Sequence, residues 1–101
     1  MKVNYAGCAI CDSAWGNLWE VVEGTRLFFC CAVCVAQFRN LVDRIKAEAR
    51  WDAIDSLIIE GDRRGRLCTA SRGAQSYSCR VAFNSEGAIR SFRTEAIPSP
   101  A

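Results

Sequence analysis

The feature that most constrains this chain is a set of five cysteines near its start, arranged in two close groups. Cys8 and Cys11 form the first group, and Cys30, Cys31 and Cys34 form the second. Two residues between cysteines let one turn of backbone deliver both sulfurs to a single ion, and zinc prefers four such ligands in a tetrahedron. The spacing therefore predicts a metal site that ties the two groups together.

The number of cysteines and the expected compartment favour metal ligands over disulfides. It has seven cysteines, an odd number, and its first residues lack the long apolar run and cleavage site of a signal peptide. We therefore expect a cytoplasmic protein, in which thiols stay reduced. No apolar run is long enough to span a bilayer, so we expect no membrane association. The alternative is that the cysteines are ordinary buried core residues.

The composition excludes several classes of enzyme as possible functions of this chain. The chain contains no histidine, which excludes His-based metal sites, Ser-His and Cys-His nucleophiles and imidazole acid–base catalysis. A glycine-rich phosphate loop is absent from the sequence, and acids such as Asp52 and Asp55 belong to no recognisable catalytic motif. We expect a protein without enzymatic activity.

The pattern predicts a β-hairpin between the two cysteine groups and a helix after them. Residues 17–23 and 26–29 are rich in Trp, Val, Leu and Phe, and Gly24 supplies the positive φ that a tight turn needs. From Cys31 the apolar period changes to about 3.6 residues, which predicts an amphipathic helix that ends near Arg50. Its apolar stripe consists of Cys34, Phe38, Leu41, Val42, Ile45 and Ala49.

The sequence pattern of residues 51–97 predicts a short helix followed by an antiparallel β meander. Asp52 resembles an N-cap with an acid three residues later, so we expect a helix over residues 53–59, although residues 57–59 are equally suited to a strand. Alternating apolar and polar residues predict strands over residues 66–71, 76–83 and 88–96. A four-residue turn between the first two of these strands would place Cys68 directly opposite Cys79.

The cysteine-rich part resembles the treble-clef zinc fingers of the TRASH, YHS, MYM and L24e-like type. That family has a C-x2-C knuckle, a Val…Gly hairpin and then Phe-Cys-x3-Cys-x3-Phe. The matching segments are Cys8-Ala9-Ile10-Cys11, Val22-Glu23-Gly24 and Phe29-Cys30-Cys31-Ala32-Val33-Cys34-Val35-Ala36-Gln37-Phe38. The resemblance covers roughly residues 8–41. Asp12 stands where the family commonly has glycine, and aspartate tolerates left-handed backbone better than most residues.

The resemblance implies that Cys8, Cys11, Cys30 and Cys34 hold one zinc ion. Cys31 then stands where the family usually carries serine. From spacing alone Cys31 is an alternative to Cys30, because residues three or four apart from Cys34 share one face of a helix. Four thiolates fill the tetrahedron and leave no position for water or substrate, so the zinc is expected to be structural.

These patterns together predict a small α+β protein. Its N-terminal treble-clef finger, with the long helix, covers residues 1–50 and packs against a C-terminal antiparallel β meander. Residues 51–97 hold the short helix and the meander of the same compact domain, and residues 98–101 form a tail. All three tryptophans are expected in the core: Trp15, Trp19 and Trp51.

The distribution of arginines along the chain suggests a negatively charged partner. Seven arginines but only two acidic residues lie between residues 62 and 93, a net charge of +5. Six of them form a candidate nucleic-acid face: Arg63, Arg64, Arg66, Arg80, Arg90 and Arg93. Strand alternation places Tyr77 and Phe83 on the face opposite Arg80, so these rings are expected in the core.

We predict a binding module for nucleic acid, a ribonucleoprotein or another protein; the sequence does not indicate an oligomeric state.

The alternative function is a thiol-based metal or redox sensor, or a metal-trafficking protein. TRASH-like fingers are associated with metal trafficking and sensing, and three thiols lie outside the ligand set implied by the resemblance: Cys31, Cys68 and Cys79. Cys68 and Cys79 are a candidate redox pair or an additional metal contact. The competing interpretation is that both are buried core residues.

Overall fold

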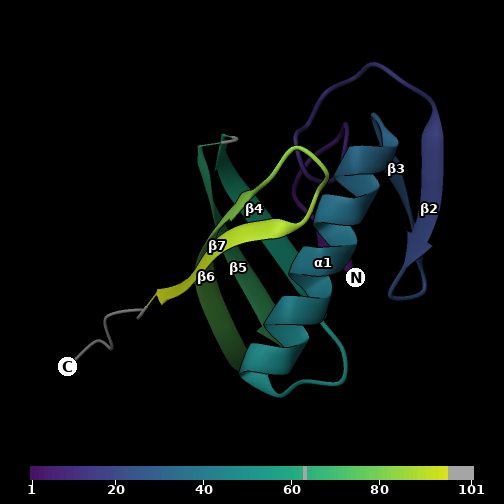
Figure 1. Ribbon diagram of the computed structural model, residues 1–101. Coiled ribbons are helices and arrows are strands. Elements are labelled where there is room, and N and C mark those ends of the chain that lie inside the picture. Colours follow the sequence, from purple (N-terminus) through teal and green to yellow (C-terminus); the bar gives the residue numbers. More distant parts are fainter. Residues whose placement is uncertain (63, 96–101) are drawn as a thin grey trace.

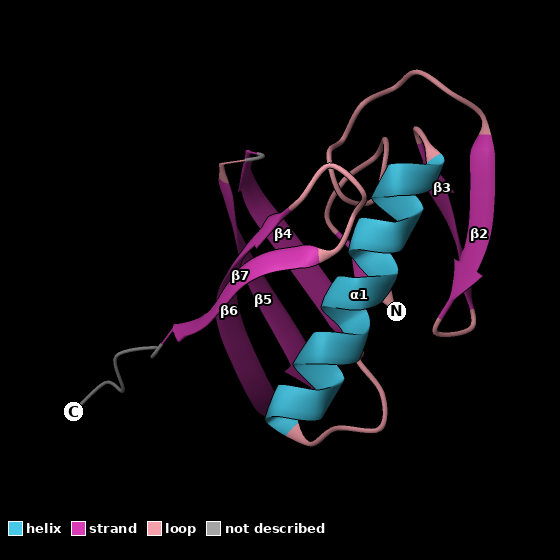
Figure 2. Cartoon of the chain, in the orientation of Figure 1, coloured by secondary structure: helices cyan, strands magenta, loops and turns pink. Residues whose placement is uncertain are grey.

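The computed structural model describes residues 1–62 and 64–95. Its elements in chain order are β1 (Lys2–Val3), β2 (Leu18–Val22), β3 (Thr25–Phe29), α1 (Ala32–Ala49), β4 (Ser56–Asp62), β5 (Gly65–Arg72), β6 (Gln75–Phe83) and β7 (Ile89–Glu95). Helix α1 lies between the β2–β3 hairpin and a five-stranded sheet (Figure 1), and Figure 2 shows how the single helix separates the two groups of strands. The predicted α+β class is confirmed.

Helix α1 forms where the apolar stripe predicts it. Cys31 is its N-cap, with an extended backbone, and the helix ends at Ala49 because Arg50 adopts the left-handed conformation with φ 59°. The buried residues of α1 are Cys34, Val35, Phe38, Leu41, Val42 and Ile45. The ring of Phe38 meets that of Phe29 edge-on, with centroids 5.5 Å apart. The apolar stripe thereby joins the helix to the hairpin as well as to the sheet.

The hairpin also forms where it was predicted. Glu23 and Gly24 have φ values of 52° and 76°, and two successive positive φ angles give the turn that matches the twist of a two-residue hairpin. Strands β2 and β3 pair antiparallel along their whole length. Side chains alternate between the two faces of the hairpin, so that Val22, Leu27 and Phe29 are buried on the face toward the core.

The prediction that the tryptophans belong to the core is wrong for two of them. Trp15 is 62% exposed and Trp19 is 47% exposed, whereas Trp51 is partly buried against the core. Trp19 lies on the outer face of the hairpin because its neighbours along β2 take the inner face. Its ring packs edge-on against Phe28, with centroids 5.4 Å apart, and the Arg26 guanidinium lies 4.6 Å from its centroid.

The large sheet has the strand order β1-β4-β5-β6-β7. Strands β4 to β7 form an antiparallel meander, of which β5, β6 and β7 were predicted. The turn between β5 and β6 contains Gly73 with φ 57° and sets Ser71 opposite Ser76. Cys68 therefore stands directly opposite Cys79, as the expected turn predicts.

The helix expected over residues 53–59 is wrong, and strand β4 occupies most of that range. Leu57 and Ile59 are fully buried while the residues that follow each of them are exposed, which is the period of a strand. Asp55, the acid that we interpreted as part of a helix cap, makes a different contact: its carboxylate accepts a hydrogen bond of 2.6 Å from the backbone N–H of Gly73. Asp55 therefore joins two segments that are distant in sequence and does not cap a helix.

Strand β1 was not predicted, and it makes the sheet mixed. It pairs in parallel with β4, with Lys2 beside Ser56, and the Lys2 N–H donates a hydrogen bond of 2.9 Å to the Asp55 carbonyl. The Asn4 side chain continues this pairing. Its amide donates to the Ile59 carbonyl and accepts from the Ile59 N–H, both at 2.9 Å. The segment before the first cysteine group is thus fastened to the C-terminal sheet.

Two remaining expectations concern the ends of the chain and the membrane. The predicted tail, residues 98–101, lies outside the described residues. Among the described residues, no helix combines the length and the hydrophobicity needed to cross a bilayer.

The loop that leads into β2 passes very close to the backbone at the start of the second cysteine group. Gly16 has φ 91°, and a Cβ atom at this position would lie 2.5 Å from the Cys30 carbonyl oxygen. Real Cβ atoms do not approach backbone this closely. Glycine at position 16 is therefore required both by its conformation and by its neighbour.

We expect Gly16→Ala to destabilise the protein more than Gly24→Ala does. Both glycines have positive φ, but a Cβ at Gly24 would meet nothing within 4 Å. Gly24→Ala should cost about 1–2 kcal/mol from the left-handed conformation alone, and Gly16→Ala should cost more because the Cys30 backbone must also move. Urea denaturation of the two variants measures the difference; equal losses would contradict the close approach.

Candidate metal centre

Four cysteine sulfurs converge at one point inside the molecule. The Sγ atoms of Cys8, Cys11, Cys30 and Cys34 all lie within 4.8 Å of one another. The Cys30 sulfur is 3.5 Å from that of Cys11 and 3.4 Å from that of Cys34. Ligands about 2.3 Å from a central zinc ion would be about 3.8 Å apart. These four thiols could therefore hold a metal ion.

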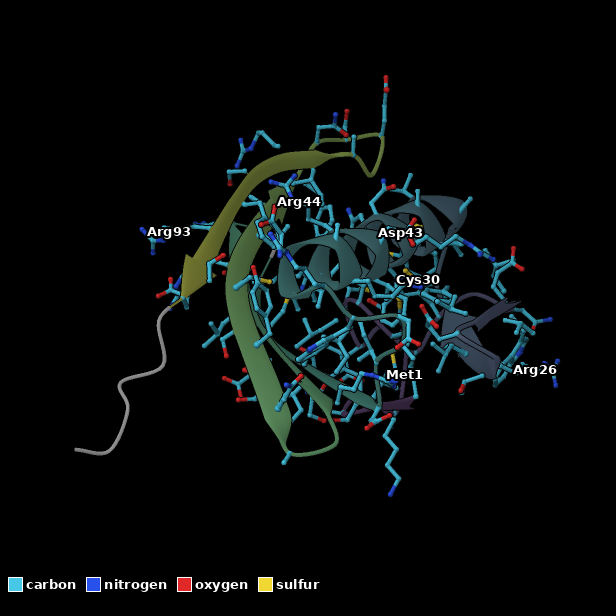
Figure 3. All side chains as sticks on the ribbon, turned by 90° about the horizontal axis from the view of Figure 1, so that it is seen from below. Met1, Arg26, Cys30, Asp43, Arg44 and Arg93 are labelled. Carbon is cyan, nitrogen blue, oxygen red and sulfur yellow. The ribbon has the colours of Figure 1, made fainter. Side chains whose placement is uncertain are left out.

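The protein encloses most of this cluster. In Figure 3, Cys30 lies between Arg93 on one side of the view and Arg26 on the other. Cys8, Cys30 and Cys34 are buried, and Cys11 is partly buried. A charged group at this position would be shielded from water on most sides.

The first cysteine pair sits on a turn that its own backbone closes. The Asp12 N–H donates to the Cys8 carbonyl at 2.8 Å, and the Cys8 N–H donates to the Ser13 carbonyl at 2.9 Å. Asp12 has φ 62°, as the sequence comparison with the glycine of the finger family led us to expect. Its carboxylate accepts a hydrogen bond of 2.9 Å from the Gly7 N–H, which helps to offset the cost of that conformation.

Strand β3 and helix α1 position the second pair. Cys30 directly follows β3, and Cys34 lies in the first turn of α1. The turn of the first pair is tied to the same strand, because the Ala9 N–H donates to the Phe28 carbonyl at 2.9 Å. The unpaired N–H groups and the positive end of the helix dipole at the start of α1 favour thiolates.

Crowding shifts the pKa values of Cys8, Cys30 and Cys34 in different directions. A hydrogen bond from the Cys34 thiol, aided by the backbone N–H groups of Ile10, Cys30 and Cys11, lowers the pKa of Cys8 to about 4. Burial raises the pKa of Cys30 to about 12. The hydrogen bond to Cys8, together with burial, raises the pKa of Cys34 well above its usual range.

Cys31 lies beside the cluster and is not a member of it. Its sulfur is 3.9 Å from that of Cys30, and its side chain is partly exposed at the N-cap of α1. The backbone N–H of Cys34 is the main cause that lowers the pKa of Cys31. Of the two alternatives that the spacing left open, the sulfur of Cys30 is the one that points into the four-cysteine group.

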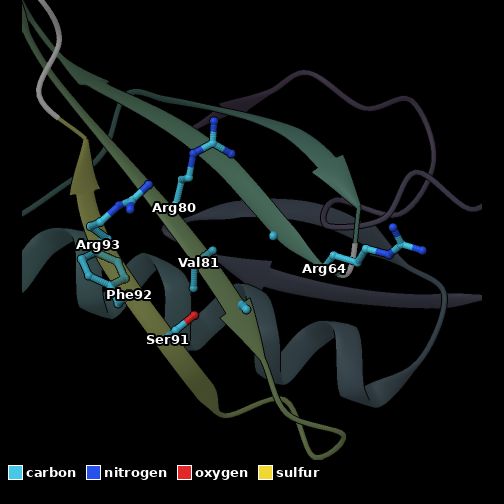
Figure 4. Close-up of a pocket in the computed structure, with 8 residues that line it drawn as sticks. Arg64, Arg80, Val81, Ser91, Phe92 and Arg93 are labelled. Carbon is cyan, nitrogen blue, oxygen red and sulfur yellow. The ribbon is translucent and has the colours of Figure 1, made fainter.

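Three of the six candidate arginines gather around a shallow pocket of about 310 Å³ on the large sheet (Figure 4). Arg64 reaches it from the β4–β5 turn, and Arg80 and Arg93 stand side by side on β6 and β7. The Glu95 carboxylate contacts both of the latter, at 3.0 Å from Arg80 and 2.8 Å from Arg93. These two arginines chiefly account for the lowered pKa of Glu95.

The other candidate arginines do not join this group. Arg66 points to the opposite face of the sheet, where it is only 8% exposed and contacts the Gly61 carbonyl at 3.5 Å. Arg90 is exposed but does not line the pocket. Arg63 lies outside the described residues. The rings of Tyr77, Phe83 and Phe92 pack against the core.

Cys68 and Cys79 are both fully buried and do not belong to the four-sulfur cluster. They lie on the face of the sheet that α1 covers, together with Val81. Both residues are also free thiols. The structure therefore separates this pair from the metal centre.

The comparisons with known proteins give one match. A protein-family model, Ta0938, matches residues 5–95, which include every cysteine, helix α1 and the whole β4–β7 meander. Searches of curated proteins and of solved structures found no similar protein. The match covers most of the chain, and the protein therefore belongs to the Ta0938 family.

Proposed function

We propose that this protein is a small, non-enzymatic binding module in which one structural zinc ion holds the cysteine-rich part in shape. The convergence of four thiol sulfurs supports this function. A ligand set of four soft thiolates at tetrahedral spacing is typical of zinc or of iron–sulfur centres, and a single enclosed position favours one zinc ion. With four protein ligands, the metal has no open position for a substrate.

The order of elements around the cluster supports the treble-clef assignment. A turn carries Cys8 and Cys11, the β2–β3 hairpin follows, and the first turn of α1 carries Cys34. This is the arrangement of the TRASH-like fingers that the sequence resembles. In our proposal Cys8, Cys11, Cys30 and Cys34 are the zinc ligands, and Cys31 is not.

Single replacements of the two neighbouring cysteines test the ligand set. We expect one zinc ion per chain in native mass spectrometry of the wild-type protein. Cys30→Ser should lose the bound zinc, because the Cys30 sulfur lies within 3.5 Å of two cluster sulfurs. Cys31→Ser should keep it and serves as the matched control. Retention in Cys30→Ser together with loss in Cys31→Ser would show that the assignment is wrong.

Removal of the zinc should unfold at least residues 8–41. Zinc binding contributes on the order of 10–16 kcal/mol in small fingers, which is comparable to the total stability of about 5–15 kcal/mol of an ordinary domain. Far-UV and near-UV circular dichroism during titration with a strong chelator measures the loss, and added zinc should restore the spectra. Spectra that stay unchanged after complete metal removal would contradict a structural role.

We further propose that the arginine pocket contacts the phosphates of nucleic acid. The lining of this pocket carries three arginines, and the one carboxylate in contact with two of them, Glu95, leaves the group positive. Arg80 and Arg93 are 51% and 72% exposed, so their guanidinium groups can reach a ligand. Arginine neutralises phosphates and releases their counterions.

Salt-dependent binding to generic single-stranded RNA and DNA tests this surface. Arg80→Ala should weaken binding and reduce the slope of log K against log salt by about one. Glu95→Gln should tighten binding, because it removes the carboxylate that competes with phosphate for Arg80 and Arg93. Arg39→Ala, which removes the same charge from the helix near the hairpin, should have little effect. Fluorescence anisotropy measures all four proteins, and absence of binding at low ionic strength would refute the proposal.

A further inference from the structure

The two cysteines at the centre of the large sheet face each other across neighbouring strands. Cys68 on β5 is the direct partner of Cys79 on β6. Directly opposed residues of an antiparallel pair have Cα atoms about 4.5–5.5 Å apart, and a disulfide accepts Cα separations of about 4.4–6.8 Å. The backbone therefore already meets the main geometric requirement for a bond between the two sulfurs.

From this geometry we propose that Cys68 and Cys79 form a reversible dithiol–disulfide pair that is independent of the metal centre. The tight turn at Gly73 holds the register that sets them opposite. Both are fully buried and neither sulfur belongs to the cluster. Each thiol thus has the other as its nearby cysteine partner, and the metal ligands need not take part.

The surroundings of the pair distinguish the two sulfurs. A hydrogen bond from Cys68 lowers the pKa of Cys79, and the same contact, together with burial, raises the pKa of Cys68. Arg66 lies on the same face of β5, and its positive charge acts in the opposite sense, lowering the pKa of Cys68. The lowered pKa of Cys79 favours Cys79 as the thiolate that attacks first, with Cys68 as the thiol that resolves the intermediate.

Hydrogen peroxide is the oxidant that suits a buried pair, because it is small. The Cys79 thiolate attacks one peroxide oxygen, the O–O bond breaks, and Cys79 sulfenic acid and hydroxide form. The Cys68 sulfur then attacks the Cys79 sulfur, the S–O bond breaks, and the proton of Cys68 leaves with the departing hydroxide as water. The two thiols lose two electrons, and the peroxide is reduced to water. A dithiol reductant reverses the bond by exchange.

The bond would change the stability of the sheet without changing its register. It would join β5 to β6, which pair with each other along most of their length. A cross-link constrains the unfolded chain, and for a chain of this size we expect oxidation to raise the melting temperature by about 10 °C. Burial would also slow reduction, since a reductant reaches the sulfurs only when the strands open.

Tryptic mapping of the zinc-loaded, full-length protein tests the proposal. After treatment with hydrogen peroxide and alkylation of the remaining thiols, trypsin cleaves after Arg66, Arg72 and Arg80. Cys68 then falls in the peptide of residues 67–72 and Cys79 in that of residues 73–80. We expect these two peptides to appear joined and two hydrogens lighter than their sum, to separate after reduction, and to be joined while bound zinc stays at one per chain.

Two variants identify the bond. Cys79→Ser should abolish the joined peptide, whereas Cys31→Ser, which removes a partly exposed thiol outside the pair, should leave it unchanged. The wild-type digest decides the proposal even if Cys79→Ser folds poorly. The proposal is wrong if residues 67–72 and 73–80 still carry alkylated thiols when peroxide has fully oxidised Cys31, or if Cys68 is joined to any cysteine of the cluster.

Discussion

The rest of the structure depends on the meeting of three backbone segments at four cysteine sulfurs. The turn at Cys8, the end of β3 and the first turn of α1 each bury apolar residues beside this point, among them Ile10, Phe29 and Val35. Backbone hydrogen bonds set the turn against β3, and Gly16 lets the connecting loop pass the Cys30 carbonyl without a clash. Four crowded thiols remain at this point, and in the proposed zinc-bound state the cation would neutralise their thiolates. Metal binding and the local fold would then depend on each other.

Helix α1 connects the cysteine cluster to the sheet and to the hairpin. Its first turn belongs to the cluster, its buried stripe covers the sheet, and Phe38 contacts the hairpin through Phe29. The binding surfaces that remain open lie on the far sides of this arrangement. The arginine pocket opens on the sheet face away from α1, and the exposed ring of Trp19 lies on the hairpin face away from the core.

The parts of the fold that could be predicted from the sequence are those determined by short segments of the chain. The turn at Gly24, the helical stripe of α1 and the strand alternation of β6 are properties of short segments, and each was predicted correctly. The failures involve contacts between distant segments. Asp55 was interpreted as the acid that follows an N-cap at Asp52, whereas its carboxylate binds the backbone of Gly73, which is distant in sequence. Strand β1 is two residues long and exists only through its pairing with β4.

The same distinction applies to the candidate sites. Cysteine spacing indicated the cluster, but the choice between Cys30 and Cys31 depends on the direction in which each side chain leaves the end of β3. Among the arginines, charge alone could not separate Arg66, which faces the core, from Arg80, which faces outward, until the register of β5 against β6 was known. That Trp19 would be exposed followed only from knowing which face of the hairpin the helix covers.

The attachment of Asn4 and β1 to β4 has a thermodynamic consequence for metal binding. The segment that leads into the first cysteine turn is aligned by the C-terminal sheet, through Asn4 and Ile59 in particular. The sheet therefore orders this turn without the help of an ion. If the four thiols bind a metal ion as proposed, their affinity would be coupled to the folding of strand β4, and residues 1–50 alone would bind the ion more weakly than the whole chain.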